Sequence, residues 1–141
     1  MAKIFAIANQ KGGVGKTTTT VNLAAALAAS GQRVLLVDLD PQGNATMGSG
    51  VDKRTLEHGV YQVLLGLTSL PAARQRFATG SYDVLPANRE LAGAEVELID
   101  LDDRETRLKR VLVAHGHEYD FVLIDCPPSL SMLTINGLCA A

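Results

Sequence analysis

Short apolar runs alternate along the chain with longer stretches in which apolar residues recur every three or four positions. The short runs are apolar at nearly every position, which is typical of strands that are buried on both faces. Pro86 stops one of them, and Pro127 and Pro128 stop another. We expect strands at residues 4–8, 33–38, 82–85 and 121–125.

The longer stretches have the spacing of helices that lie with one face on a sheet. In the first of them the apolar pattern ends before Gly31, where a helix C-cap is expected. We expect helices at residues 17–30, 55–65, 90–99 and 104–114, and the beginning of another at 134–141. Residues 41–52 are rich in Gly, Asn, Ser and Thr, and they predict a loop.

Strands that alternate with helices predict an α/β fold, in which a mostly parallel sheet carries helices on both faces. Ligands of such folds bind outside the carboxyl ends of the strands. Candidate ligand-binding residues stand at the carboxyl ends of three predicted strands. They are the glycine-rich residues 9–15, the pair Asp38 and Asp40, and Asp125. We therefore expect these groups to converge at one edge of the sheet.

The composition agrees with one globular domain. The chain has 141 residues, of which 47% are hydrophobic and 20% are charged. The net charge is -2, so the chain as a whole lacks the excess of basic residues that is typical of nucleic-acid-binding proteins. No apolar run approaches the ~20 residues of a membrane span, and the apolar start is too short for a signal peptide. These features predict a cytoplasmic protein without a membrane partner.

Cys126 and Cys139 are consistent with that compartment. Two thiols do not make a disulfide framework, and their spacing matches no zinc site. We expect free thiols, and the alternative is that they bind a metal cluster shared between subunits.

The most informative motif is a glycine-rich loop between a predicted strand and a predicted helix. It reads Lys11-Gly12-Gly13-Val14-Gly15-Lys16-Thr17. Its glycines let successive N–H groups point inward as an anion cradle, to which the following helix adds its positive N-terminal end. Lys16 can contact the β- and γ-phosphates of a nucleotide, Thr17 can ligate Mg²⁺, and Thr18 is placed for the α-phosphate. The motif predicts a P-loop, although Gln10 occupies the position of the usual first glycine.

Acidic residues at two strand ends complete the candidate site. Asp125 closes an apolar strand and is the expected partner of Thr17 around Mg²⁺. Asp38 and Asp40 point to the same side if their strand continues, so that one can orient the attacking water while the other supports the metal. We favour Asp40 for the water and Asp38 for the metal, and the alternative is that these acids are solvated.

Three segments together resemble the ParA/Soj ATPases that partition chromosomes and plasmids. These ATPases belong, with MinD, to the deviant Walker A class of P-loop proteins. The segments are residues 9–18 (NQKGGVGKTT), 37–46 (VDLDPQGNAT) and 123–130 (LIDCPPSL). In that class the first glycine is replaced and a signature lysine is added, which here is Lys11.

The resemblance implies binding of ATP with Mg²⁺ and hydrolysis to ADP and phosphate. It places Lys16 on the phosphates, Thr17 on Mg²⁺, Asp40 on the hydrolytic water and Asp125 in the outer shell of the metal. Lys11 would reach across an ATP-dependent homodimer to the phosphates of the partner subunit, as an arginine finger does. The implied partners are a ParB-type centromere-binding protein and non-specific DNA of the nucleoid.

Members of the family are longer than this chain. The resemblance therefore makes residues 1–141 the N-terminal part of a single P-loop ATPase domain, with the C-terminal part absent. The missing part would hold the adenine-contacting loop and the DNA-binding surface, so that the isolated chain would hydrolyse ATP weakly or not at all. Ile4, Phe5 and Ile7 would then lie on a strand at an open sheet edge.

Three alternative functions share some of these features. A MinD-like ATPase that positions cell division shares the loop but needs a C-terminal membrane helix. The nitrogenase iron protein also shares the loop and supplies two cysteines to a bridging cluster, but the spacing of Cys126 and Cys139 does not fit it. The third alternative is a nucleotide-binding fragment without turnover.

Overall fold

A five-stranded sheet forms the centre of the computed structural model, which describes residues 2–8, 14–52, 56–76 and 82–141. The strand order is β1-β5-β2-β4-β3. The strands are β1 (Lys3–Ile7), β2 (Val34–Asp38), β3 (Gln75–Arg76), β4 (Asp83–Leu85) and β5 (Phe121–Asp125). All neighbours are parallel except β3 and β4. The predicted mostly parallel sheet is thereby confirmed.

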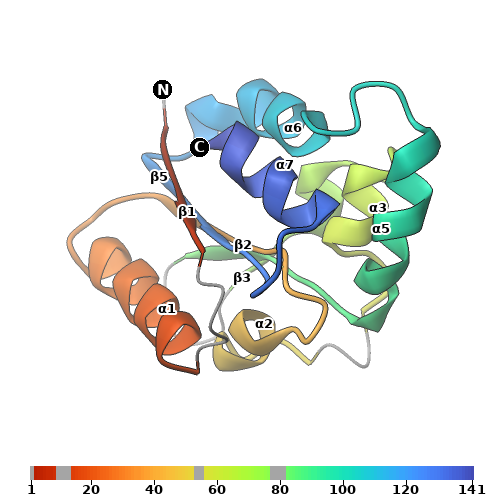
Figure 1. Cartoon of the computed structure of the whole chain (residues 1–141). Coiled ribbons are helices and arrows are strands. Elements are labelled where there is room, and N and C mark those ends of the chain that lie inside the picture. The colour runs from red at the N-terminus through yellow and green to blue at the C-terminus, as the bar shows by residue number, and fades with distance from the viewer. Residues whose placement is uncertain (1, 9–13, 53–55, 77–81) are drawn as a thin grey trace.

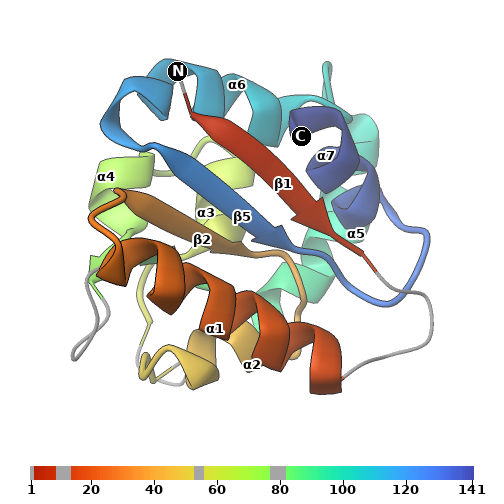
Figure 2. The same cartoon turned by 90° about the vertical axis from the view of Figure 1, so that its left-hand side faces the viewer.

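Helices cover both faces of this sheet (Figures 1 and 2). One face carries α1 (Val14–Ala29) and α2 (Asn44–Gly48). The other face carries α3 (Val60–Leu64), α5 (Ala94–Glu97), α6 (Arg107–His115) and α7 (Met132–Ala140). The short helix α4 (Leu70–Ala73) leads into β3, and the 3-10 turns η2 (Arg89–Gly93), η3 (Leu98–Asp100) and η4 (Gly116–Glu118) complete the connections.

Two apolar clusters explain why β2 and β5 are apolar up to the aspartate that ends each of them. Leu36 and Leu123 pack against α1 and α2, whereas Leu35 and Ile124 pack against the larger helical layer. Successive side chains of a strand point to opposite faces, so a strand that is covered on both sides needs apolar residues throughout.

Helix α7 lies unusually close to the end of β5. A Cβ added at Gly137 would stand 2.7 Å from the Cys126 sulfur and 3.2 Å from a methyl carbon of Leu39. The buried Asn136 ties the same helix to α6, because its Oδ1 accepts from Leu108 N at 3.2 Å and its Nδ2 donates to Arg104 O at 2.7 Å. The segment between β5 and α7 is therefore held at both ends.

Several predicted boundaries were wrong. The expected loop 41–52 contains α2, and the expected helix 55–65 is reduced to α3. Gly59 is extended instead of helical, since Val60 N donates to Pro86 O at 2.8 Å. The helix expected at 90–99 is a succession of η2, α5 and η3, and α4 and β3 were not predicted.

Strand β1 forms one edge of the sheet and pairs with β5 alone among the described strands. The Phe5 side chain stacks on Phe121 with ring centroids 6.4 Å apart, and Phe5 is 50% exposed. The expectation that Ile4, Phe5 and Ile7 lie on an edge strand is confirmed. Within the described residues, no helix is both long and apolar enough to cross a membrane.

Candidate functional site

The carboxyl ends of three neighbouring strands meet at one level of the sheet. Ile7 of β1 is in register with Asp125 of β5, which is in register with Asp38 of β2. The backbone ladder continues one step further, through Cys126 N to Ile7 O at 3.0 Å and Leu39 N to Asp125 O at 2.9 Å. The predicted convergence of the strand ends is confirmed.

The glycine-rich loop lies between β1 and α1. Lys11, Gly12 and Gly13 fall outside the described residues, so their predicted roles stay predictions. Val14 is the first residue of α1. Gly15 is exposed, and a Cβ added there would meet no atom of the described residues within 4 Å. Packing against the described part of the chain therefore does not require a glycine at position 15.

Lys16 extends from the first turn of α1 to the end of β5. Its Nζ donates to Asp125 Oδ1 at 2.6 Å and also to the Cys126 carbonyl oxygen. The side chains of both ion-pair partners are almost completely buried. A buried ammonium group needs such partners, because desolvation of an unpaired charge is costly.

Thr17 contacts the second oxygen of the same carboxylate. Its Oγ1 donates to Asp125 Oδ2 at 3.2 Å. A hydroxyl and a carboxylate side by side are hard oxygen donors of the kind that Mg²⁺ takes, usually with several waters and a substrate phosphate. The pair therefore fits Mg²⁺, and it is the pair that the sequence predicted for this metal.

Burial raises the pKa of Asp125, while the hydrogen bond and charge of Lys16 and the hydroxyl of Thr17 counteract that effect. The nearby Asp40 carboxylate raises the pKa of Asp125 further. The hydrogen bond and charge of Lys16 are therefore the main effects that offset the burial of Asp125.

Asp38 is fully buried beside Asp125, and both of its oxygens accept hydrogen bonds. Oδ1 accepts from Asp40 N at 3.0 Å, while Oδ2 accepts from Thr46 N at 2.9 Å and from Thr46 Oγ1 at 2.8 Å. Burial raises its pKa to about 7 against the pull of these bonds, and the neighbouring charge of Asp125 adds to the rise. This geometry gives no support to the metal role that the sequence suggested for Asp38, because its oxygens hold the two ends of the segment 40–46.

Asp40 begins that segment. Its Oδ1 accepts from Gln42 N at 3.0 Å and its carbonyl accepts from Gly43 N at 2.8 Å, which makes a tight turn. Its carboxylate lies close enough to Asp125 to raise the pKa of that residue.

Thr46 is a site residue to which the sequence assigned no role. Besides its two bonds to Asp38, its Oγ1 accepts from Ala87 N at 2.9 Å. It thereby connects the end of β2 to the segment after β4. No sequence signal identifies this link, because its partners lie 8 residues before and 41 residues after Thr46.

A hollow of about 380 Å³ adjoins the site between α1 and α2. Thr17 and Thr18 line it from α1, and Asn44 and Gly48 line it from α2. Thr18 lies beside Thr17 at this hollow, and its role at the α-phosphate stays a prediction.

The cysteines offer no metal centre among the described residues. Cys126 is buried and Cys139 is exposed, and both are free thiols. Burial raises the pKa of the Cys126 thiol to about 11, which disfavours the thiolate that a metal would need. In the described part of the chain, no group of three or more His, Cys, Asp or Glu is arranged to hold a metal ion.

Comparison with known proteins decides the family. Residues 2–141 match a family described as an AAA domain. The sporulation initiation inhibitor protein Soj of Bacillus subtilis is 55% identical over 141 residues, which are 100% of this chain and 56% of Soj. This chain belongs to the ParA/Soj family of partitioning ATPases.

A further relative and a solved structure agree with this assignment. The chromosome partitioning protein ParA of Myxococcus xanthus is 48% identical over 141 residues, which are 100% of this chain and 50% of that relative. A crystal structure described as cobyrinic acid a,c-diamide synthase from Mycobacterium smegmatis, with bound ADP and magnesium, superimposes with a TM-score of 0.96. It is 52% identical, and the match covers 100% of this chain and 57% of that one. The chain spans about half the length of the curated relatives it matches.

Proposed function

We propose that this chain provides the phosphate- and magnesium-binding part of an ATPase that hydrolyses ATP to ADP and phosphate. One observation carries the proposal. Lys16 and Thr17, at the start of α1, both contact the Asp125 carboxylate at the carboxyl edge of a parallel sheet. The ADP and magnesium in the Mycobacterium smegmatis structure support the same ligands here.

Each side chain has a definite task in this proposal. Lys16 and the N–H groups around Gly15 bind the phosphates, and Thr18 holds the α-phosphate. Thr17 binds Mg²⁺ directly, and Asp125 holds it through a water. When bound, the metal neutralises charge that develops on the transferred phosphoryl group. Asp40 orients the attacking water, and Asp38 keeps the segment 40–46 in place.

Phosphate binding changes the partner of Lys16. In this structure, the Lys16 Nζ pairs with Asp125. The phosphate oxygens of a bound nucleotide would compete with Asp125 for the same ammonium group. Because Asp125 is buried, its charge then needs a replacement cation, which Mg²⁺ supplies. Binding of ATP and of Mg²⁺ are therefore expected to favour each other.

The partner and assembly proposals come from the family. Lys11, Gly12 and Gly13 would line an interface in which Lys11 contacts the nucleotide of a second subunit. The name of the Myxococcus xanthus relative favours chromosome partition. A ParB-type partner, nucleoid DNA and a cytoplasmic location belong to this proposal.

The Lys16→Ala variant tests the phosphate role. Because Lys16 would supply the positive charge that meets the phosphates, Mg²⁺-ATP affinity should fall by at least about tenfold, a loss of about 1.4 kcal/mol. Lys109→Ala, which removes an exposed lysine from α6, is the matched control. Fluorescence titration with an ATP analogue measures both, after circular dichroism has confirmed that each variant is folded. Equal affinity of the two variants would contradict the proposal.

Two further variants separate turnover from binding. Asp40→Ala, made in a chain of the full family length, should bind ATP as the parent does while hydrolysis falls. Lys11→Ala should bind ATP but lose ATP-dependent dimerisation in size-exclusion chromatography. Normal turnover in the first or an ATP-induced dimer in the second would remove that residue from the mechanism.

A further inference from the structure

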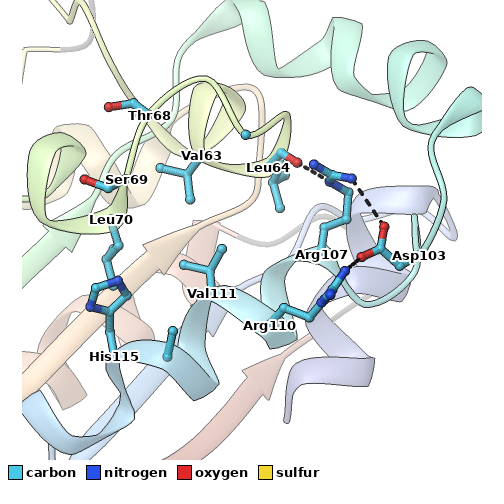
Figure 3. Close-up of a pocket in the computed structure, with 12 residues that line it drawn as sticks. Val63, Leu64, Thr68, Ser69, Leu70, Asp103, Arg107, Arg110, Val111 and His115 are labelled. Atoms are coloured by element: carbon cyan, nitrogen blue, oxygen red, sulfur yellow. Dashed lines mark hydrogen bonds and ion pairs between the residues drawn. The ribbon is translucent and has the colours of Figure 1, made fainter.

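A second hollow lies between α6 and the segment that runs from α3 to α4 (Figure 3). Its volume is about 410 Å³, which is within the ~300–1,000 Å³ of small-molecule sites. None of its lining residues belongs to the proposed phosphate and magnesium site. A ligand in this hollow would therefore bind independently of the proposed ATPase chemistry.

Apolar side chains line the inner part of this pocket. Val63 and Leu64 of α3 and Leu70 of α4 are buried members of the larger apolar cluster. Val111 of α6 faces them across the hollow (Figure 3). Water against such a surface gains few hydrogen bonds, so an apolar ligand group that displaces it is favoured.

Two arginines stand at one end of the pocket (Figure 3). Arg107 donates through Nε to the Leu64 carbonyl and through Nη1 to Asp103 Oδ1 at 3.3 Å. Arg110 donates through Nη1 to the other oxygen of Asp103. Two guanidinium groups thus share a single carboxylate, and this end of the pocket keeps one positive charge.

Donors of both arginines remain for a second anion. No hydrogen bond among the described residues uses Nη2 of Arg107, which would lie 3.4 Å from a Cβ added at Gly66. Gly66 has a φ of +77°, so a side chain there is disfavoured and the approach to this nitrogen stays open. The Arg110 side chain is 72% exposed.

The opposite end of the pocket has different electrostatics. His115 lies there, and its Nδ1 contacts Glu118 Oε2 at 2.7 Å. Arg74 also pairs with Glu118 at 2.8 Å and balances that acid, whereas at the arginine end two guanidinium groups share one acid. A planar carboxylate suits a guanidinium group, which can donate two parallel hydrogen bonds to it.

We propose that this pocket binds a carboxylate group carried on an apolar body. The carboxylate contacts Arg107 and Arg110 in competition with Asp103, and the apolar body covers Val63, Leu70 and Val111. Such a group can belong to a free organic acid or to an acidic side chain with apolar neighbours in a partner protein.

Titration of the full chain with octanoate, followed by two-dimensional NMR of the backbone amides, tests this inference. Saturable shifts are expected around the pocket, and octanamide should bind about tenfold more weakly because it lacks the charge. Arg110→Gln should weaken octanoate binding by about tenfold. Arg104→Gln is the matched control, since Arg104 is also exposed and paired with an acid but lies outside the pocket.

Asp103→Asn gives a test in the opposite direction. It removes the internal competitor, and asparagine readily adopts the left-handed φ of 53° found at this position. Octanoate should bind several-fold more tightly to it, whereas a merely disturbed pocket would bind less. The proposal is overturned if octanoate does not saturate, if octanamide matches it, if both arginine variants behave alike, or if Asp103→Asn weakens binding.

A capped peptide, Ac-Leu-Glu-Leu-NH₂, distinguishes the two sources of the carboxylate. Competition by the peptide against octanoate would assign the site to an acidic side chain of a partner protein. Octanoate binding without such competition would assign it to a free organic acid.

Discussion

At the scale of single residues, two buried carboxylates at adjacent strand ends are stabilised in different ways. Asp125 has the ammonium group of Lys16 beside it, whereas the hydrogen bonds to Asp38 come from the backbone and hydroxyl groups of Asp40 and Thr46. Neutral donors compensate burial less well than a cation does, so the pKa of Asp38 rises to about 7. Strand-end acids are visible in the sequence, but their different partners depend on the fold.

The raised pKa of Asp38 predicts how stability depends on pH. Between its ordinary value of 3.8 and about 7, the folded chain keeps a proton that the unfolded chain has lost. The stability contributed by that proton is present at low pH and is lost as pH rises toward and above 7. The loss is on the order of a few kcal/mol at most.

Urea unfolding at pH 5.5 and pH 8.5 measures this effect, with Asp38→Asn as the comparison. The variant stays neutral, so its free energy of unfolding should fall less between the two pH values than that of the parent. An identical fall in both proteins would mean that Asp38 does not titrate in this range.

At the scale of elements, the sequence predicted the long periodic segments and missed the short ones. Strand β5 was predicted at its observed bounds, and α1 and α7 within three residues of theirs, because buried runs and helical spacing are local signals. Helix α2 has five residues, and its N-cap Gly43 makes no side-chain cap. A helix of that length is not stable alone, and here its tertiary bonds to Asp38 and Ala87 hold it.

The site residues also divide into those that local sequence predicts and those whose role depends on tertiary contacts. The glycine-rich loop and Asp125 follow from local sequence, whereas the role of Thr46 depends on contacts that are remote along the chain. Local spacing also placed Asp38 and Asp40 on the same side. It did not show that the Asp38 carboxylate would accept hydrogen bonds from Asp40 N and from the backbone and hydroxyl of Thr46.

Thr46 predicts a specific loss of stability. Valine has nearly the same shape but cannot accept from Ala87 N or donate to Asp38, and Ala87 is buried. Thr46→Val should lower the free energy of unfolding by about 1–3 kcal/mol, as expected when buried polar groups lose a partner. Thr46→Ser keeps the hydroxyl and should therefore retain most of the free energy of unfolding that Thr46→Val loses. If urea unfolding gives the serine variant the larger loss, packing of the methyl group matters more than the hydrogen bonds.

At the scale of the whole molecule, β1 is an edge strand with a half-exposed aromatic residue. Unpaired backbone groups on such an edge can template pairing with another chain. We therefore expect this 141-residue chain to self-associate without nucleotide, by a contact distinct from the ATP-dependent dimer proposed above.

Sedimentation velocity without nucleotide tests this expectation. Phe5→Lys places a charge on the edge strand and should shift the protein toward monomer. Leu138→Lys is the control, because Leu138 on α7 is 51% exposed and Phe5 is 50% exposed. Association that weakens equally in both variants would indicate general hydrophobic contact and not edge pairing.

A pair of glycine variants tests whether the start of α1 binds the phosphates of ATP. Among the described residues, a Cβ added at Gly15 or at Gly116 would meet no atom within 4 Å, and neither glycine has a positive φ. Alanine should therefore leave the fold intact at both positions, while at Gly15 its methyl group would occupy space needed by the phosphates.

Calorimetric titration with Mg²⁺-ATP, with the melting temperature measured without nucleotide, gives the decisive comparison. We predict that Gly15→Ala loses at least about tenfold in affinity, equivalent to about 1.4 kcal/mol, without a lower melting temperature. Gly116→Ala should keep both the affinity and the melting temperature of the parent. ATP binding by Gly15→Ala that is as tight as that of Gly116→Ala would contradict the proposed phosphate site.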